Sequence, residues 1–153
     1  MFKFDGFLWL FLIKLIAIYD ILVPYTGYLA LVLRLWVGAN LIIHARPKLG
    51  AGAAGAAGFA KTLGAPRGAA KVVTYLELLG GIFLVVGLIV PLVAILFIIQ
   101  FVVISIAKRV KMHARYIDPG KLSYEIDVLY LILSTVILVL GPGLLSLDAL
   151  IGI

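Results

Sequence analysis

The chain has 153 residues, of which 65% are hydrophobic and 13% are charged, with a net charge of +6. Soluble domains have roughly 45–50% apolar and about 25% charged residues, and a globule of this size cannot bury so large an apolar excess. The composition therefore excludes a soluble domain, a disordered chain and a nucleic-acid-binding module. It predicts a protein embedded in a lipid bilayer.

The first hydrophobic stretch, residues 6–23, is predicted to form a membrane-spanning helix, although it carries Lys14 and Asp20. It does not resemble a secretory signal peptide, because Asp5 interrupts the basic start and no small-residue cleavage site follows. A helix that lies on the membrane surface is the alternative for this stretch.

Four further stretches approach the length of about 20 apolar residues that crosses a bilayer, namely residues 28–45, 71–90, 92–107 and 124–141. Pro91 ends one stretch and opens the next, which predicts a tight hairpin. The fold class is therefore all-α: an integral membrane four-helix bundle in residues 28–150, with an additional hydrophobic helix in residues 1–27 and five spans in all.

Two connecting segments, residues 45–71 and 108–121, hold five basic residues each, which is ten of the thirteen in the chain. Alternating spans place both segments on one side, and basic loops stay cytoplasmic. This predicts a multi-pass protein of the cell membrane with its C-terminus outside. Within the first segment, the glycine- and alanine-rich residues 50–61 predict either a short interfacial helix or a flexible linker.

Several ionisable residues fall inside the predicted spans, where they are costly and therefore candidates for function. From the rise of a helix, Arg34 and Asp20 lie about 5–10 Å from the outer edge, and Lys14 and Glu77 about 10–12 Å from the inner edge. These depths predict that Asp20 pairs with Arg34 or Lys14 with Glu77. The alternative reading is that such pairs only neutralise each other and lock the bundle.

A second polar group gathers at the cytoplasmic end of the spans. His44 and Lys48 are four residues apart and share a helix face, and Asp127 begins the last span at a similar depth. If the helices converge, His44, Lys48, Glu77 and Asp127 line one polar pocket. The alternative is a set of end residues that extend toward the interface.

Two glycine-containing patterns predict packing and helix ends. Glu77 shares a helix face with Gly80, Gly81 and two later residues, which indicates a helix–helix seam and points Glu77 into the bundle. After the last span, residues 141–143 read Gly-Pro-Gly and stop the helix. Ser146 is then placed to cap a short terminal helix that carries Asp148 in its first turn.

The residue inventory narrows the chemistry. Cysteine is absent, which excludes disulfides, iron–sulfur clusters and a thiolate nucleophile in this chain. Only His44 lies in a span, so a bis-histidine haem is not expected, and no spacing resembles a metal site. An exchangeable quinone remains the expected cofactor. The single Asn40 and single Gln100 suit a thermophilic source.

Several short motifs follow one another in a fixed order along the chain. They are Arg34 with Gly38, His44 with Lys48, residues 63–66 (Leu-Gly-Ala-Pro), residues 76–81 (Leu-Glu-Leu-Leu-Gly-Gly) and the ending at residues 140–148. In this order the motifs resemble the DoxX family. The resemblance runs from about residue 28 to 150. It implies a four-helix membrane protein and matches Arg34, His44, Lys48, Glu77 and Asp148 to family positions. Here His44 is followed by Ala-Arg-Pro, where the family often has glycine.

Relatives in that family imply the first functional hypothesis. This is a small membrane subunit of a quinone-linked respiratory or sulfur-oxidising complex, of the thiosulfate:quinone oxidoreductase or terminal quinol oxidase type. In it, Arg34, His44 and Lys48 are the candidates to bind the quinone, and Glu77 and Asp127 are the candidates to pass protons. The chain itself supplies no redox centre.

The second hypothesis is a non-catalytic accessory subunit that packs at the periphery of a larger oxidase complex, which the extra N-terminal helix and the glycine seam favour. Both hypotheses predict membrane lipids and larger complex subunits as partners, and neither predicts nucleic acid. A small transporter ranks last because no inverted repeat or broken helix is visible.

Overall fold

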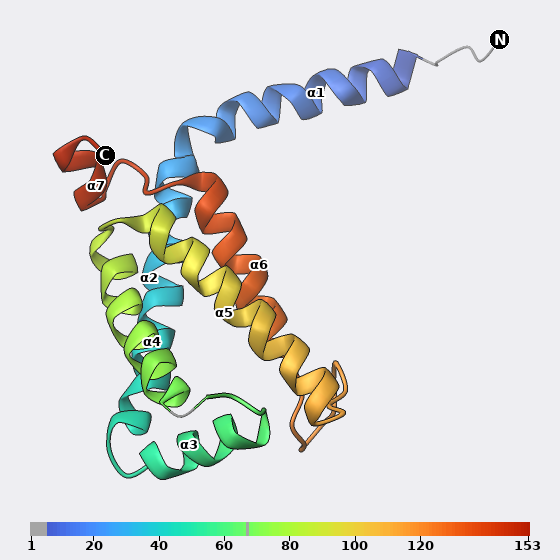
Figure 1. Ribbon diagram of the computed structural model, residues 1–153. Helices are drawn as coiled ribbons and strands as arrows, with labels where there is room; N and C mark the ends of the chain where they lie inside the picture. Colours follow the sequence, from blue (N-terminus) through green and yellow to red (C-terminus); the bar gives the residue numbers. More distant parts are fainter. Residues whose placement is uncertain (1–5, 67) are drawn as a thin grey trace.

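The computed structural model describes residues 6–66 and 68–153 and is all-helical in its named elements. Two long helices, α2 (Thr26–Ala45) and α4 (Ala69–Val86), pack against each other, and α5 (Val90–Lys111) packs against α6 (Glu125–Leu140). Contacts between α2 and α6 and between α4 and α5 join the two pairs into one bundle (Figure 1). The all-helical architecture was predicted correctly.

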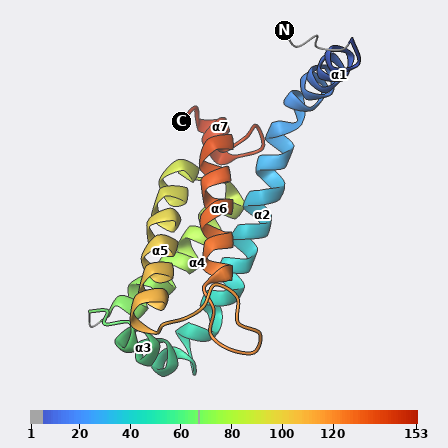
Figure 2. The same cartoon turned by 90° about the vertical axis from the view of Figure 1, so that its right-hand side faces the viewer.

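Shorter helices close the two ends of this bundle. At one end α3 (Ala53–Thr62) crosses beneath α4, and the segment that joins α5 to α6 lies at the same end (Figures 1 and 2). We call this the basic end. At the opposite end lie the α4–α5 turn and α7 (Leu147–Ile151). The prediction that both basic segments lie at one end is confirmed. For residues 50–61 the sequence predicted either a short helix or a flexible linker, and the structure forms the short helix α3 there.

The first helix, α1 (Gly6–Leu22), leaves the bundle. A 3-10 turn at Val23–Tyr25, which contains Pro24, joins it to α2, and in neither view does α1 lie alongside the other helices (Figures 1 and 2). The predicted pairs Asp20–Arg34 and Lys14–Glu77 were therefore wrong: Glu77 pairs with Lys48, and Arg34 bonds to backbone carbonyls. Matching depths are insufficient because α1 and the bundle helices are not neighbours.

Three helical stretches among the described residues are long and apolar enough to cross a membrane: residues 9–49, Ala69–Val86 and Val90–Lys111. The predicted count of five spans is not confirmed. The helix α6 has 16 residues, which rise about 24 Å and fall short of a hydrocarbon core of about 30 Å. Although it is short, α6 packs against α5, so the bundle consists of the four helices α2, α4, α5 and α6.

Helix ends explain two differences from the predicted boundaries. Gly87 adopts a left-handed conformation (φ +73°) and ends α4 four residues earlier than predicted, and Pro91 stands in the first turn of α5. At its other end α5 runs on to Lys111, so three of the predicted loop bases are helical. Basic residues in a last turn are favoured by the helix dipole.

The interior is built around an aliphatic and aromatic core that includes Leu41, Leu84, Phe97 and Ile137. The seam between α2 and α4 is formed by glycines: a Cβ on Gly38 would lie 2.6 Å from the carbonyl oxygen of Gly81. The predicted glycine seam is therefore confirmed. Many large apolar side chains point outward instead, as is expected of a surface that lies in lipid.

Candidate functional site

A pocket of about 350 Å³ lies at the basic end of the bundle. Helices α2, α4, α5 and α6 contribute its walls, together with the 3-10 turn Arg46–Leu49 that follows α2 and the end of the α5–α6 connection. Its charged and polar lining residues are His44, Lys48, Glu77, Lys108, Lys121, Ser123, Asp127 and Tyr130, and its apolar lining residues are Leu41, Phe101, Leu122 and Ile126. We call this the basic-end pocket.

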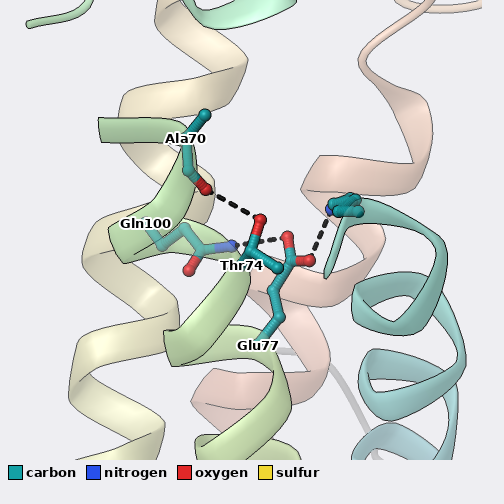
Figure 3. A network of polar contacts seen from close by, with 5 residues as sticks. Ala70, Thr74, Glu77 and Gln100 are labelled. Carbon is teal, nitrogen blue, oxygen red and sulfur yellow. Dashed lines mark hydrogen bonds and ion pairs between the residues drawn. The ribbon is translucent and has the colours of Figure 1, made fainter. Parts of the chain in front are cut away.

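Glu77 is held by groups from two other elements. Its Oε2 accepts a hydrogen bond from Lys48 Nζ at 2.5 Å, and its Oε1 accepts one from Gln100 Nε2 at 3.2 Å (Figure 3). The Glu77 side chain is only 7% exposed, whereas that of Lys48 is 33% exposed. The carboxylate is thus fixed inside the bundle, and the lysine connects it to the surface.

Asp127 forms a second ion pair on the opposite side of the pocket. Lys108 Nζ lies 2.5 Å from Asp127 Oδ2, and the side chains are 12% and 11% exposed. The same ammonium group lies 3.4 Å from the Ser123 carbonyl oxygen and 6.0 Å from the centre of the Phe59 ring in α3. Lys108 therefore joins α3, α5 and α6, and Asp127 neutralises it.

An aromatic wall lines the same pocket as the two ion pairs. The rings of Phe101 and Tyr130 are stacked, with centroids 5.1 Å apart and an angle of 13° between their planes. His44 meets Tyr130 edge-on at 6.3 Å. Flat aromatic faces next to hydrogen-bonding groups provide a surface on which a planar ligand ring can stack.

The pocket brings together four of the five predicted site residues. His44, Lys48, Glu77 and Asp127 line it, as the convergence of the spans predicted. Arg34 does not join them. It is fully buried near the opposite end, where its guanidinium donates to the carbonyl oxygens of Leu84 at 3.2 Å and Leu145 at 2.7 Å.

Asp148 lies at the same far end and acts as a helix cap. Its carboxylate accepts hydrogen bonds from the backbone N–H groups of Ile89 at 2.6 Å and Val90 at 2.8 Å, where α5 begins. Ser146 caps α7 by accepting a bond from the Ala149 N–H at 3.1 Å, as predicted. Arg34 and Asp148 thus tie the α4–α5 turn to the segment after α6, and we call this arrangement the far-end clamp.

Sequence reasoning missed Lys108 and Gln100. Lys108 was counted with the loop bases, although no Gly or Pro separates it from the apolar stretch that precedes it, which was a signal that it is helical. Gln100 is the only glutamine in the chain and interrupts the most apolar span, which marks it as a polar contact inside the bundle. Its Oε1 is buried and has no hydrogen-bond partner among the residues that the structure describes.

The Lys108–Asp127 pair gives a first testable prediction. Lys108→Met or Asp127→Leu alone is expected to lower the free energy of unfolding by about 3 kcal/mol, because each leaves a poorly solvated charge without its partner. The double variant is expected to be more stable than either single variant, since no charge remains uncompensated. An SDS titration of the detergent-solubilised protein, followed by circular dichroism, measures all three. Additive losses would contradict the pairing.

The fold and site define a small multi-pass α-helical membrane protein with a polar pocket at one end of its bundle. A family model described as DoxX matches residues 29–109, more than half of the chain. The protein belongs to the DoxX family. Comparison with curated proteins finds no match, and neither does comparison with solved structures. Among residues 6–66 and 68–153, no group of three or more metal-binding side chains could hold an ion.

Proposed function

We propose that this protein is a membrane subunit of a quinone-linked respiratory or sulfur-oxidising complex, and that its basic-end pocket contributes to the quinone site. The observation that carries the proposal is that the stacked rings of Phe101 and Tyr130 line the same pocket as two lysine–carboxylate pairs. Membership of a family often associated with quinone-linked oxidoreductases supports it.

The residues of the pocket fit a quinone ring. The volume of about 350 Å³ lies at the lower end of the range of about 300–1,000 Å³ that small-ligand sites occupy. Tyr130 and Phe101 offer a face for stacking, and His44 and Lys48 are hydrogen-bonding groups within the same lining. The exposed apolar side chains of Leu122 and Ile126 at the rim offer a path for an isoprenoid tail.

The chemistry that a bound quinone supplies is the uptake of two electrons and two protons to give the quinol. The electrons come from a redox centre in a partner subunit. Glu77 takes up a proton on the side where the partly exposed Lys48 reaches the surface, and delivers it to the pocket that it lines. Asp127, which is 11% exposed and is held by Lys108, delivers the second proton. In each pair the lysine holds the carboxylate in place, and the carboxylate exchanges the proton.

Glu77→Gln tests this role. The variant is expected to lower quinone turnover by the assembled complex about 10²–10⁴-fold, the usual contribution of a positioned acid–base group. The amide keeps the shape of the side chain, so the protein is expected to stay folded in the membrane. Turnover is measured in membranes or in the gently purified complex with a soluble quinone analogue.

The matched control is Glu125→Gln, which removes an exposed carboxylate near the pocket that does not line it. Full turnover is expected for this variant. Tyr130→Ala provides a binding readout: it removes the stacked ring and is expected to lower the amount of co-purified quinone about tenfold. Unchanged turnover in Glu77→Gln, together with unchanged quinone content in Tyr130→Ala, would refute the proposal.

A non-catalytic accessory role is the second candidate, and α1 favours it. This helix leaves the bundle with Lys14, Asp20 and large apolar side chains such as Trp9 and Ile16 exposed, as a helix that docks on a neighbouring subunit would. Gentle purification from the native membrane, with and without residues 2–22, tests this role. Loss of the partner subunits on truncation, with normal turnover in Glu77→Gln, supports the accessory role over the first proposal.

A further inference from the structure

A second pocket lies at the basic end between α3 and the start of α4. Its volume is about 290 Å³, and it is lined by Lys48, Leu49, Ala53, Ala56, Ala57, Ala70, Lys71, Thr74 and Tyr75. We call it the α3–α4 pocket. It shares only Lys48 with the basic-end pocket.

The shape of the α3–α4 pocket depends on small side chains. Ala53, Ala56 and Ala57 are spaced so that they share one face of α3, and Ala70 faces the pocket from α4. Longer side chains at these positions would fill the space. The Gly-Ala repeat of α3, which the quinone proposal leaves without a role, therefore has a consequence: it keeps a cavity open beside α4.

The charges of the α3–α4 pocket have one sign. Lys48 and Lys71 are its charged lining residues, and Tyr75 adds a hydroxyl group, whereas the Thr74 hydroxyl donates to the Ala70 carbonyl oxygen at 2.7 Å. No carboxylate lies among the lining residues of this pocket, and the sequence from Arg46 to Lys71 contains none. Glu77 neutralises Lys48 from the other side, and no ion pair within the described part of the chain involves Lys71. Lysine ammonium and hydroxyl groups together bind phosphate oxygens.

The position of the α3–α4 pocket indicates where the phosphate comes from. It lies where α4 begins, and in that first part of α4 the lining residue Tyr75 and Val72, which follows Lys71, are 54% and 68% exposed. A phosphate in the pocket thus has an apolar surface beside it along which acyl chains can run. Basic residues at this level of a membrane protein attract anionic lipid.

We propose that the α3–α4 pocket binds the phosphate group of an anionic lipid. Lys71 and the exposed side of Lys48 contact the phosphate, the alanines of α3 leave room for it, and the acyl chains lie against Val72 and Tyr75. This site does not depend on the quinone proposal. A bound phosphate would contact Lys48, which also pairs with Glu77 and lines both pockets.

Native mass spectrometry of the full-length protein in detergent tests the site. Equal amounts of phosphatidylglycerol and phosphatidylcholine are added, and the bound lipids are counted. The wild-type protein is expected to retain phosphatidylglycerol in preference. Lys71→Gln is expected to reduce this preference about fivefold, the usual effect of one lysine at an anionic surface.

Two further variants separate a built pocket from general surface charge. Ala57→Leu fills the pocket without changing any charge and is expected to abolish the preference; Ala57 is exposed, so leucine is accommodated there without unfolding α3. Lys61→Gln removes a base of α3 that lines neither pocket and is expected to bind like wild type.

Four outcomes would overturn the proposal. Equal retention of both lipids by the wild-type protein would show that no anionic site exists. An equal loss in Lys61→Gln, or no loss in Ala57→Leu, would show that the preference comes from the basic surface as a whole. Displacement of all bound lipid by millimolar inorganic phosphate, with no selectivity among lipids, would show that the site takes the free anion instead.

Discussion

Asp148→Ala is expected to lower the free energy of unfolding by about 3–5 kcal/mol, the range for breaking a buried charge-assisted network. The carboxylate is 1% exposed and accepts both backbone N–H groups at the start of α5. Its removal leaves Ile89 and Val90 without an acceptor in an apolar environment, where an unpaired N–H group is costly. An SDS titration monitored by circular dichroism measures the loss.

Two matched variants show whether the far-end clamp is the cause. Asp148→Asn retains one carbonyl acceptor and is expected to fall between the wild-type protein and Asp148→Ala. Glu125→Ala removes an exposed acid from the first turn of α6 and is expected to cost no more than about 1 kcal/mol, which is the scale of a helix-dipole contact. A small loss in Asp148→Ala, similar to that in Glu125→Ala, would contradict the clamp.

Gly81→Leu is expected to destabilise the bundle by at least about 3 kcal/mol, the upper part of the range for overpacked interiors. A Cβ at this position would lie 2.8 Å from the Gly38 carbonyl oxygen, and that atom belongs to the backbone of α2 and cannot rotate away. The leucine side chain would have to push α2 away from α4, and these two helices pack closely against each other along the seam. Small residues allow this close approach.

The same substitution at Gly55 gives a control of opposite sign. A Cβ there meets nothing within 4 Å, and Gly55 lies inside α3. Gly55→Leu is expected to be neutral or to stabilise the protein by up to about 1 kcal/mol through helix propensity. Equal stability changes in the two variants would show that glycine content, rather than the α2–α4 seam, sets the effect.

How far the candidate site was predictable depends on the kind of contact. The spacing of His44 and Lys48 predicted one shared helix face, and Glu77 was predicted to face the glycine seam; all three line the pocket, although α2 ends at Ala45 and Lys48 lies in the 3-10 turn Arg46–Leu49 that follows it. Asp127 joined them because the span ends converge at the same end of the bundle. Their roles as quinone ligand or proton carrier remain proposals.

Partner choice was not predictable in the same way. Depth in the membrane paired Glu77 with Lys14 and Arg34 with Asp20, whereas the structure pairs Glu77 with Lys48 and buries Arg34 against backbone carbonyls. Depth gives one coordinate, and an ion pair also needs its two helices to be neighbours. The pairing of Lys108 with Asp127 was missed for a related reason, since the end of α5 was placed too early.

The sequence by itself determined the membrane environment, the helical class, the shared end of the two basic segments and the seam at Gly81, because hydropathy, charge and residue size act locally along the chain. Only the tertiary structure decided that α1 stands apart, that Asp148 reaches back to cap α5 and that α3 leaves a pocket beside α4. These features depend on how helices that are distant in the sequence pack against one another. That packing is set by contacts between segments, and the sequence of one segment does not determine them.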